Sequence, residues 1–112
     1  MGQPKRQEAT VGMSVDGKSL DPTDKSLATL EDLLIHRYFN DRPAIATCKS
    51  LAETGVHLGL TLNLGNYESA KIDVFVRIPC LLTGSELEAA HEAAYEWASS
   101  KVKAIAKRVK QR

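Results

Sequence analysis

Two stretches in which apolar and polar residues alternate strictly lie near the middle of the chain, at residues 56–64 and 70–78. Successive side chains of a β-strand point to opposite faces, so each stretch predicts a strand with one apolar and one polar face. The segment 64–69 between them is rich in residues that favour turns. We therefore predict a β-hairpin over residues 56–80, whose second strand ends at Pro79 because proline has no amide to donate.

The pattern leaves two pairing registers open for the hairpin. A loop of three residues places Leu62 opposite Ala70, whereas a loop of five residues places Leu62 opposite Ile72. Both registers keep the apolar side chains of the two strands on one face. A two-residue turn is excluded, because it would set apolar residues against polar ones.

A first helix is predicted before the hairpin, as the N-terminal ordered element. Thr23, Asp24 or Ser26 can accept hydrogen bonds from its first amides, and Pro43 stops it because residues before proline resist helical geometry. Steps of three and four place its apolar residues on one face. Those residues are Leu27, Leu30, Leu33, Leu34 and Tyr38.

A long amphipathic helix is predicted after the hairpin. It opens within residues 83–88, where both Thr83 with Glu86 and Ser85 with Glu88 have the spacing of a capping box. Its apolar stripe matches the leucine-rich face of the hairpin, and the alanines in the stripe allow close approach. The stripe consists of Leu87, Ala90, Ala94, Ala98, Val102, Ile105 and Val109.

Residues 43–54 fit two structures. Pro43 and Gly55 would frame a short helix, which we favour, whereas the alternation within residues 45–51 fits a strand. Because an isolated hairpin is only marginally stable, a third strand is expected from this segment or from a second subunit. The second alternative predicts a homo-oligomer.

These elements predict an α+β fold with a single domain over residues 23–112. It consists of an N-terminal helix, an antiparallel hairpin with room for a third strand, and a long C-terminal helix packed on the hairpin. Residues 1–22 carry only scattered apolar side chains, too few to offset the entropy lost on ordering. We predict that they form a flexible tail.

The composition is ordinary for a soluble globular protein, with 43% hydrophobic and 26% charged residues. The net charge of +1 excludes a partner selected by overall charge alone. No apolar run approaches the ~20 residues of a membrane span, and none near the start resembles a signal peptide. We expect a cytoplasmic protein with no membrane partner, and two reduced thiols at Cys48 and Cys80.

Three residues on the polar face of the hairpin suggest nucleic-acid binding. Lys71, Phe75 and Arg77 share this face, so an aromatic ring lies between two cations. Bases of a single strand stack on such rings while phosphates contact the cations. A structural role competes with this interpretation, because Phe75 covers Gly59 in the five-residue register. Asp73 also weakens the positive charge.

Two further groups of residues are candidate contacts. Tyr67 lies at the loop tip, where binding residues are common, although it can also fold back onto the hairpin. Residues 101–112 contain several cations and no acid, a pattern that suits phosphates but also complements a helix dipole. The candidates in this run are Lys103, Lys107, Arg108 and Lys110.

The sequence contains no recognisable catalytic motif. Its three histidines and two cysteines lack the spacing of zinc ligands. It has no glycine-rich phosphate loop and no nucleophile elbow. We therefore expect no catalytic residue, no metal and no cofactor, and a protein that is not an enzyme.

The segment 60–74, with Gly65-Asn66-Tyr67-Glu68-Ser69 in its turn, resembles a pattern in small proteins of bacteriophages and related mobile elements. In those proteins a strand, a turn of this kind and a second strand precede one amphipathic helix. The resemblance covers residues 55–109. It implies a phage-encoded protein that acts in DNA replication or recombination in the host cytoplasm, and it transfers no catalytic residue.

The leading hypothesis is a small oligomeric protein that prefers single-stranded DNA. It would use the aromatic and basic hairpin face together with the basic end of the last helix. The alternative is a phage protein that docks on another protein, as a virion component or as an inhibitor of a host or defence enzyme.

Overall fold

The predicted hairpin forms the two longest strands of the computed structural model. β3 (Ala52–Gly65) and β4 (Glu68–Cys80) pair antiparallel, with Leu62 opposite Ala70. This is the register of the three-residue loop, so the five-residue register is wrong. The hairpin is longer at its open end than the alternation indicated, because β3 already pairs with β4 at Ala52.

Backbone conformation at the turn explains the short loop. Gly65 and Tyr67 adopt φ angles of 81° and 63°, in the left-handed region that reverses a chain tightly. The Gly65 amide donates a hydrogen bond to Asn63 Oδ1 at 2.9 Å, and a bulge interrupts the pairing between these two residues. The chain therefore reverses within three residues, which is too few for the five-residue loop.

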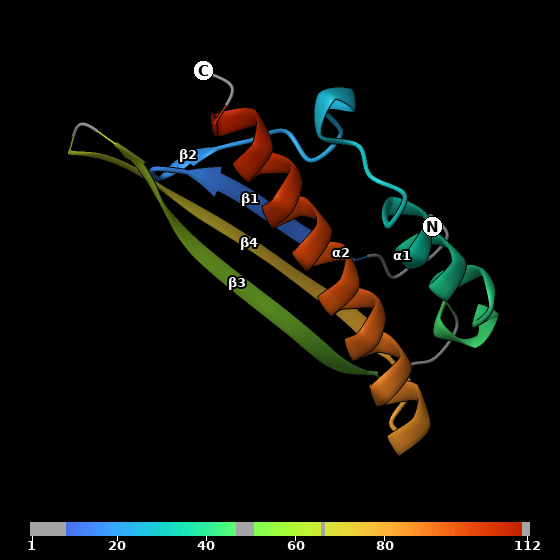
Figure 1. Cartoon of the computed structure of the whole chain (residues 1–112). Coiled ribbons are helices and arrows are strands. Elements are labelled where there is room, and N and C mark those ends of the chain that lie inside the picture. The colour runs from blue at the N-terminus through green and yellow to red at the C-terminus, as the bar shows by residue number, and fades with distance from the viewer. Residues whose placement is uncertain (1–8, 47–50, 66, 111–112) are drawn as a thin grey trace, which may run out of the picture.

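The structure describes residues 9–46, 51–65 and 67–110. Within these ranges four strands form one antiparallel sheet in the order β2-β1-β4-β3 (Figure 1). β1 covers Thr10–Val15 and β2 covers Lys18–Ser19. β4 is thus an inner strand, and β3 is an edge strand.

The third strand comes from a segment that the sequence pattern assigned to the tail over residues 1–22. In β1, Val11, Met13 and Val15 alternate with polar residues, and β1 pairs antiparallel with β4. Three apolar residues are enough here because they extend a face that β4 has already made apolar. The tail residues 1–8 lie outside the described residues.

The predicted N-terminal helix is wrong in place and extent. Two strands come first, and the first α-helix, α1 (Asp32–Asn40), begins after them. Only a 3₁₀ turn, η1 (Lys25–Leu27), forms where the helix was expected to start. Ala28 is then extended, and the Leu27 carbonyl accepts a hydrogen bond from Lys101 Nζ at 2.7 Å in place of a helical partner.

The apolar stripe predicted for that helix is only partly buried. Leu27 and Tyr38 are buried, whereas Leu30 and Leu33 are 85% and 62% exposed. Phe39, which the stripe did not include, is buried against Tyr38 with its ring edge-on. α1 is therefore shorter than the predicted helix, and only part of the predicted apolar stripe is buried.

Residues 43–54 contain a turn and the beginning of a strand. η2 (Pro43–Ala46) is a 3₁₀ turn, and β3 begins at Ala52. The favoured helix is absent from the described part of this segment, because pairing with β4 extends the strand toward Ala52. Residues 47–50, which include Cys48, lie outside the described residues.

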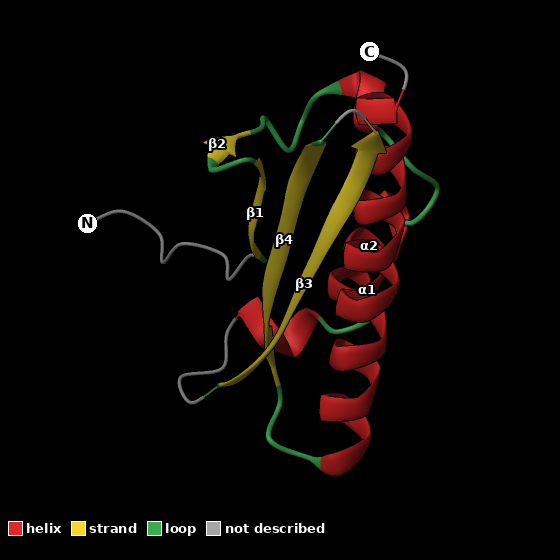
Figure 2. Cartoon of the chain, turned by 60° about the vertical axis from the view of Figure 1, so that its left-hand side comes forward, coloured by secondary structure: helices red, strands yellow, loops and turns green. Residues whose placement is uncertain are grey.

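The long C-terminal helix is confirmed as α2 (Gly84–Lys110). The Glu86 amide donates to Thr83 Oγ1 at 3.3 Å, so Thr83 caps its N-terminus. α2 packs on β3 and β4 and covers one face of the sheet, as Figures 1 and 2 show. Its buried residues are Ala90, Ala94, Trp97, Ala98, Lys101, Ile105 and Val109.

The core lies between α2 and the sheet. β4 contributes an unbroken buried row to it, because alternate residues of the strand all face α2. The row ends at Cys80, which is fully buried, and burial raises the pKa of its thiol. The row consists of Ala70, Ile72, Val74, Val76, Ile78 and Cys80.

Polar contacts fasten α1 to α2. Lys101 is 1% exposed, and its Nζ lies 2.8 Å from Asp32 Oδ1. Trp97 Nε1 donates to the same carboxylate at 2.9 Å. Burial disfavours the charge of Asp32, but hydrogen bonds from Lys101, the Thr29 amide and Trp97 outweigh it and lower the pKa of Asp32.

Candidate nucleic-acid interface

The face of the sheet opposite α2 carries polar residues from β1, β4 and β3. We call it the open face, with Lys71, Asp73, Phe75 and Arg77 of β4 at its centre. Apart from the buried Pro79 near the end of β4, its described residues are exposed or half-buried, whereas most of those on the α2 side are buried. Strand pairing places Phe75 between Gly12 of β1 and His57 of β3. The three candidate residues of β4 are thus brought onto one accessible face.

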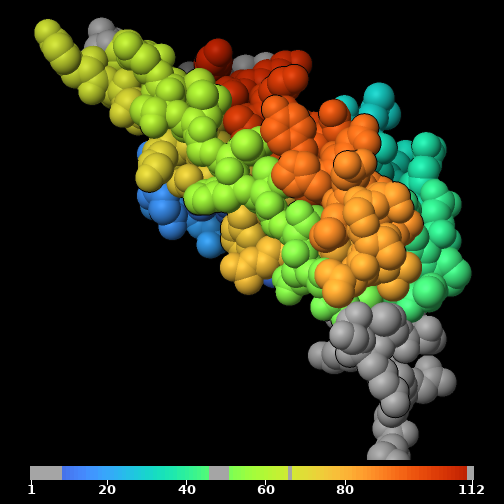
Figure 3. Space-filling view, turned by 90° about the horizontal axis from the view of Figure 1, so that it is seen from below, coloured from blue at the N-terminus to red at the C-terminus, as the bar shows by residue number. Residues whose placement is uncertain are grey.

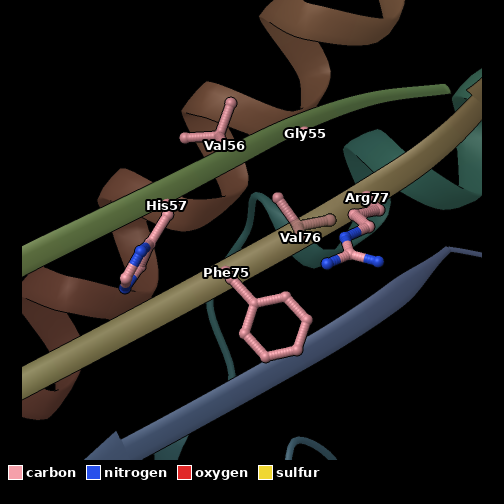
Figure 4. Close-up of a pocket in the computed structure, with 6 residues that line it drawn as sticks. All are labelled: Gly55, Val56, His57, Phe75, Val76 and Arg77. Atoms are coloured by element: carbon pink, nitrogen blue, oxygen red, sulfur yellow. The ribbon is translucent and has the colours of Figure 1, made fainter.

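The ring of Phe75 lies on β1 over Gly12. A β-carbon at Gly12 would be 2.1 Å from Phe75 Cε1, so the ring occupies the space that a side chain there would need. Figure 4 shows the ring broadside on this face, and Phe75 is 39% exposed. Phe75 thus does cover a glycine of a neighbouring strand, but that glycine is Gly12 and not Gly59. One side of the ring is supported and the other faces solvent.

A shallow depression of about 350 Å³ lies beside Phe75 on the open face (Figure 4). His57, Gly55 and Arg77 contribute to its lining. Gly55 pairs with Arg77, and a β-carbon at Gly55 would be 3.4 Å from Arg77 Cγ. The Arg77 stem therefore crosses the neighbouring strand closely, next to the ring. The volume lies near the lower end of the range of roughly 300–1,000 Å³ for small-molecule sites.

Charges on the open face are mixed. Asp73 Oδ1 lies 3.4 Å from His57 Nε2, and this pair is partly exposed to solvent. Lys71 and Arg77 are exposed, and neither forms an ion pair within the described ranges. Along β4 the Asp73 carboxylate thus lies between two exposed cations, Lys71 and Arg77.

Tyr67 lies at the end of the hairpin, away from the centre of the open face. Its side chain is fully exposed, so it does not fold back onto the hairpin. Its φ of 63° is uncommon for an aromatic residue. Figure 3 shows that the hairpin end projects beyond the body of the molecule. Tyr67 is therefore accessible, but it does not adjoin Phe75.

The basic end of α2 belongs to the other layer of the molecule. α2 lies across the sheet from the open face, so its cations do not join Lys71 and Arg77 (Figure 2). The exposed cations of this end are Lys103, Lys107, Arg108 and Lys110. Arg108 is engaged within the protein, since its Nη1 lies 3.0 Å from Asp24 Oδ2. Hydrogen bonds from Ser26, with a further one from Arg108, lower the pKa of Asp24.

Sequence reasoning missed the supporting residues of the open face. Gly12 lies in the segment assigned to the tail, and its role depends on a pairing between β1 and β4 that no local pattern specifies. His57 was placed on the correct face by alternation, but its position opposite Phe75 required the observed register. The signal available for β1 was the short alternation of residues 11–15.

The described parts of the chain hold neither a cluster of metal ligands nor a helix suited to spanning a membrane. Within them, no three His, Cys, Asp or Glu side chains gather closely enough to hold a metal ion. Nor do the described ranges contain a helix with the length and apolar character needed to cross a membrane. Comparisons with protein-family models, curated proteins and solved structures gave no match to the chain. A proposal for the function therefore rests on the residues of the open face.

Proposed function

We propose that the protein binds single-stranded nucleic acid on the open face, with a base stacked on the outward side of Phe75. The observation that carries this proposal is the Phe75 ring, which rests on Gly12 near the middle of an accessible sheet. Aromatic residues on exposed sheets bind single strands in this way, with little dependence on sequence. The preferred ligand is single-stranded DNA.

Cations on both sides of the ring support the proposal. Arg77 is one alternate position from Phe75 along β4, and Lys71 is two such positions away in the other direction. A nucleic-acid backbone that runs along β4 therefore meets a cation on each side of the stacked base. Phosphate contacts of this kind supply much of the affinity and make it depend on salt.

The remaining candidate residues have secondary roles in this proposal. Lys103, Lys107 and Lys110 attract the ligand at longer range from the helix layer, and Arg108 joins them with its charge partly offset by Asp24. The resemblance of the hairpin to phage proteins supports a phage-encoded protein that works in the host cytoplasm. Binding requires no cofactor and no catalytic step.

The proposal predicts that Phe75→Leu weakens the binding of single-stranded DNA at low salt. A loss of roughly 1–3 kcal/mol per stacked base corresponds to a decrease in affinity of about 5-fold to 140-fold. Leucine still covers Gly12 but offers no ring. Fluorescence anisotropy of a labelled oligonucleotide measures the change, and thermal unfolding checks that the variant is folded.

The matched control is Phe75→Tyr, which keeps the ring and should keep most of the affinity. Lys25→Gln, a change of an exposed cation outside the sheet, should also leave affinity near that of the wild type. Two results would overturn the proposal. One is the absence of wild-type binding at low salt, and the other is equal affinity for the Phe75→Leu and Phe75→Tyr variants.

A protein-docking function is the second candidate, and the hairpin end favours it. Tyr67 is fully exposed there, and Leu64 is 38% exposed. Exposed aromatic residues at protruding ends are typical anchors of protein interfaces. If this function holds, Tyr67→Ala abolishes the stoichiometric capture of one host or phage protein and leaves DNA affinity unchanged. Capture that is equally efficient with Tyr67→Ala would contradict it.

A further inference from the structure

The outer edge of β3 is a long strand edge without a neighbour in the described parts of the chain. β3 spans fourteen residues, and in the described sheet it pairs only with β4. The outward amides and carbonyls of such an edge form a template for another strand. Natural proteins usually block these edges with proline, lysine, bulges or a covering segment.

β3 shows almost none of these blocking devices. It contains no proline and no lysine, and its one carboxylate, Glu53, lies near its beginning. The described bulge is confined to the turn, between Asn63 and Gly65. On the α2 side, Val56 and Leu58 are half-buried and Leu60 is 38% exposed. The middle of β3 therefore lacks the features that block strand pairing, and it carries apolar side chains on the α2 side.

The neighbouring flank of α2 continues this apolar surface. Trp97 and Ser100 lie on the α1 side of the helix, since Trp97 donates to Asp32 of α1 and Ser100 hydrogen-bonds to Thr29, just before α1. At 3.6 residues per turn, Tyr95 and Val102 lie on the opposite flank of the helix. Tyr95 is 49% exposed, and Val102 is half-buried. Figure 1 shows α1 on one side of α2 and β3 on the other, so this flank borders the open edge.

We infer that two copies of this chain pair through their β3 edges, antiparallel, and join their sheets into one. A second copy carries the same unblocked edge, and an antiparallel pairing about a two-fold axis satisfies both edges at once. Antiparallel pairing also separates the two Glu53 carboxylates toward opposite ends of the joined strands. The occupant of the edge is thus a second copy of this chain.

Side-chain alternation restricts the register of the joined strands. Both copies must place their apolar rows on the α2 side. One residue of β3 must therefore lie directly opposite the same residue of the second copy, at the two-fold axis. An axis at Leu58, for example, puts Leu58 opposite its own copy and Val56 opposite Leu60. Apolar residues then meet apolar residues across the new strand pair.

The spacing of the helices fits the same arrangement. α2 packs on both β3 and β4. A helix that packs evenly on two strands has its axis over the gap between them, which is half a strand spacing inside the edge strand. With strands about 4.8 Å apart, the two α2 axes would lie about 10 Å apart across the joined edges. Packed helices have interaxial distances of roughly 8–10 Å. The flanks that carry Tyr95 and Val102 would therefore contact each other without forcing the strands apart.

Sedimentation equilibrium of the full chain without nucleic acid tests the inference directly. The wild type should be a dimer, and Leu60→Lys should raise the dimer dissociation constant by about tenfold or more, because the new charge must be buried or the strands must separate. Leu60 is already 38% exposed, so the folded monomer tolerates lysine there. Circular dichroism checks that the variant is folded.

Leu82→Lys is the matched control, since Leu82 is 76% exposed and lies in the loop before α2, outside β3. This variant should dimerise like the wild type. A monomeric wild type overturns the inference, as does a Leu60→Lys variant that dimerises unchanged. Because no DNA is present, neither result bears on the proposed function, which is tested separately by the DNA-binding experiment.

Cysteine substitution locates the two-fold axis independently. With Cys48 and Cys80 replaced by serine and alanine, single cysteines are placed in turn at Val56, Leu58 and Leu60. Only the residue nearest the axis lies opposite its own copy, so one position should form the intermolecular disulfide much faster than the others. Equal rates at all three positions would contradict antiparallel pairing through β3.

Discussion

Phe75 and Gly12 act as one unit on the open face. The ring fills the space above Gly12, so the exposed surface at this point depends on two residues from strands that are far apart in the sequence. Alternation alone predicted that Phe75 lies on the polar face. The residue beneath the ring was not predictable, because it depends on which strand pairs with β4.

We expect Gly12→Ala to destabilise the protein and to tilt the Phe75 ring away from the sheet. A β-carbon 2.1 Å from Cε1 cannot coexist with the present ring position. Overpacking of this kind costs about 1–3 kcal/mol, measurable by urea unfolding. In combination with Phe75→Leu the cost should be smaller than the sum of the two single changes. Strictly additive costs would show that the contact is not tight.

Because Lys101 is buried and Asp32 is partly exposed, we expect the loss of each partner of this ion pair to cost a different amount of stability. Asp32→Asn should lower the free energy of unfolding by about 3 kcal/mol, because it leaves an ammonium group buried without a counter-charge. Lys101→Met should cost only about 1 kcal/mol, because the Asp32 side chain, 35% exposed, can be solvated. Urea unfolding of both variants measures the difference. Equal costs would contradict this account of the pair.

At the scale of elements, α2 was predictable because its start signals and its stripe agree. The structure uses Thr83 as the cap, although the sequence offered Ser85 as well. α1 was misplaced because its leucines repeat at helical spacing, while Lys101 and Trp97, which anchor it through Asp32, lie far along the chain on α2. Long-range polar contacts of this kind leave no local pattern in the sequence.

Thr83→Ala should therefore destabilise α2, whereas Ser85→Ala should not. Removing the side-chain oxygen that accepts the Glu86 amide costs about 1 kcal/mol. Ser85 lies inside the helix and makes no such bond to an amide in the described structure. Thermal unfolding of the two variants provides the comparison. A larger loss for Ser85→Ala would show that the cap has been misassigned.

Acid should release α1 before it unfolds the sheet. The pKa of Asp32 is lowered in the folded protein, so its stabilising contribution is complete above the ordinary carboxyl pKa and is lost as the pH falls through the lowered value. The effect should begin below about pH 4. Trp97 fluorescence should change there while the circular dichroism of the sheet persists, because Trp97 donates to Asp32. Simultaneous loss of both signals would contradict this order.

At the scale of the whole molecule, cations lie on two layers that face different directions. Lys71 and Arg77 belong to the open face, whereas the exposed lysines near the end of α2 lie on the helix layer. The sequence showed both groups, but it did not show that the sheet separates them. Their separation makes the proposed contacts distinguishable by salt dependence.

Lys71→Gln should reduce the slope of log affinity against log salt by about 0.7, the value for one phosphate contact on a single strand. Lys107→Gln should reduce it by clearly less, because attraction at a distance does not replace a whole counterion at a phosphate. Anisotropy titrations over a range of salt concentrations give both slopes. If Lys107→Gln had the larger effect, the ligand would lie on the helix layer instead of the open face.

The pairing of β1 with β4 has a consequence for how the chain folds during its synthesis. β1 leaves the ribosome well before its partner strand β4, because α1 and β3 lie between them in the chain. α2, which covers the apolar side of β4, follows later still. Because contacts so distant in sequence form slowly, the hairpin is expected to assemble with α2 first and to capture β1 last. Until then, β4 presents the edge that β1 will occupy to other nascent chains, which makes this interval the point at which the protein is most prone to misassemble.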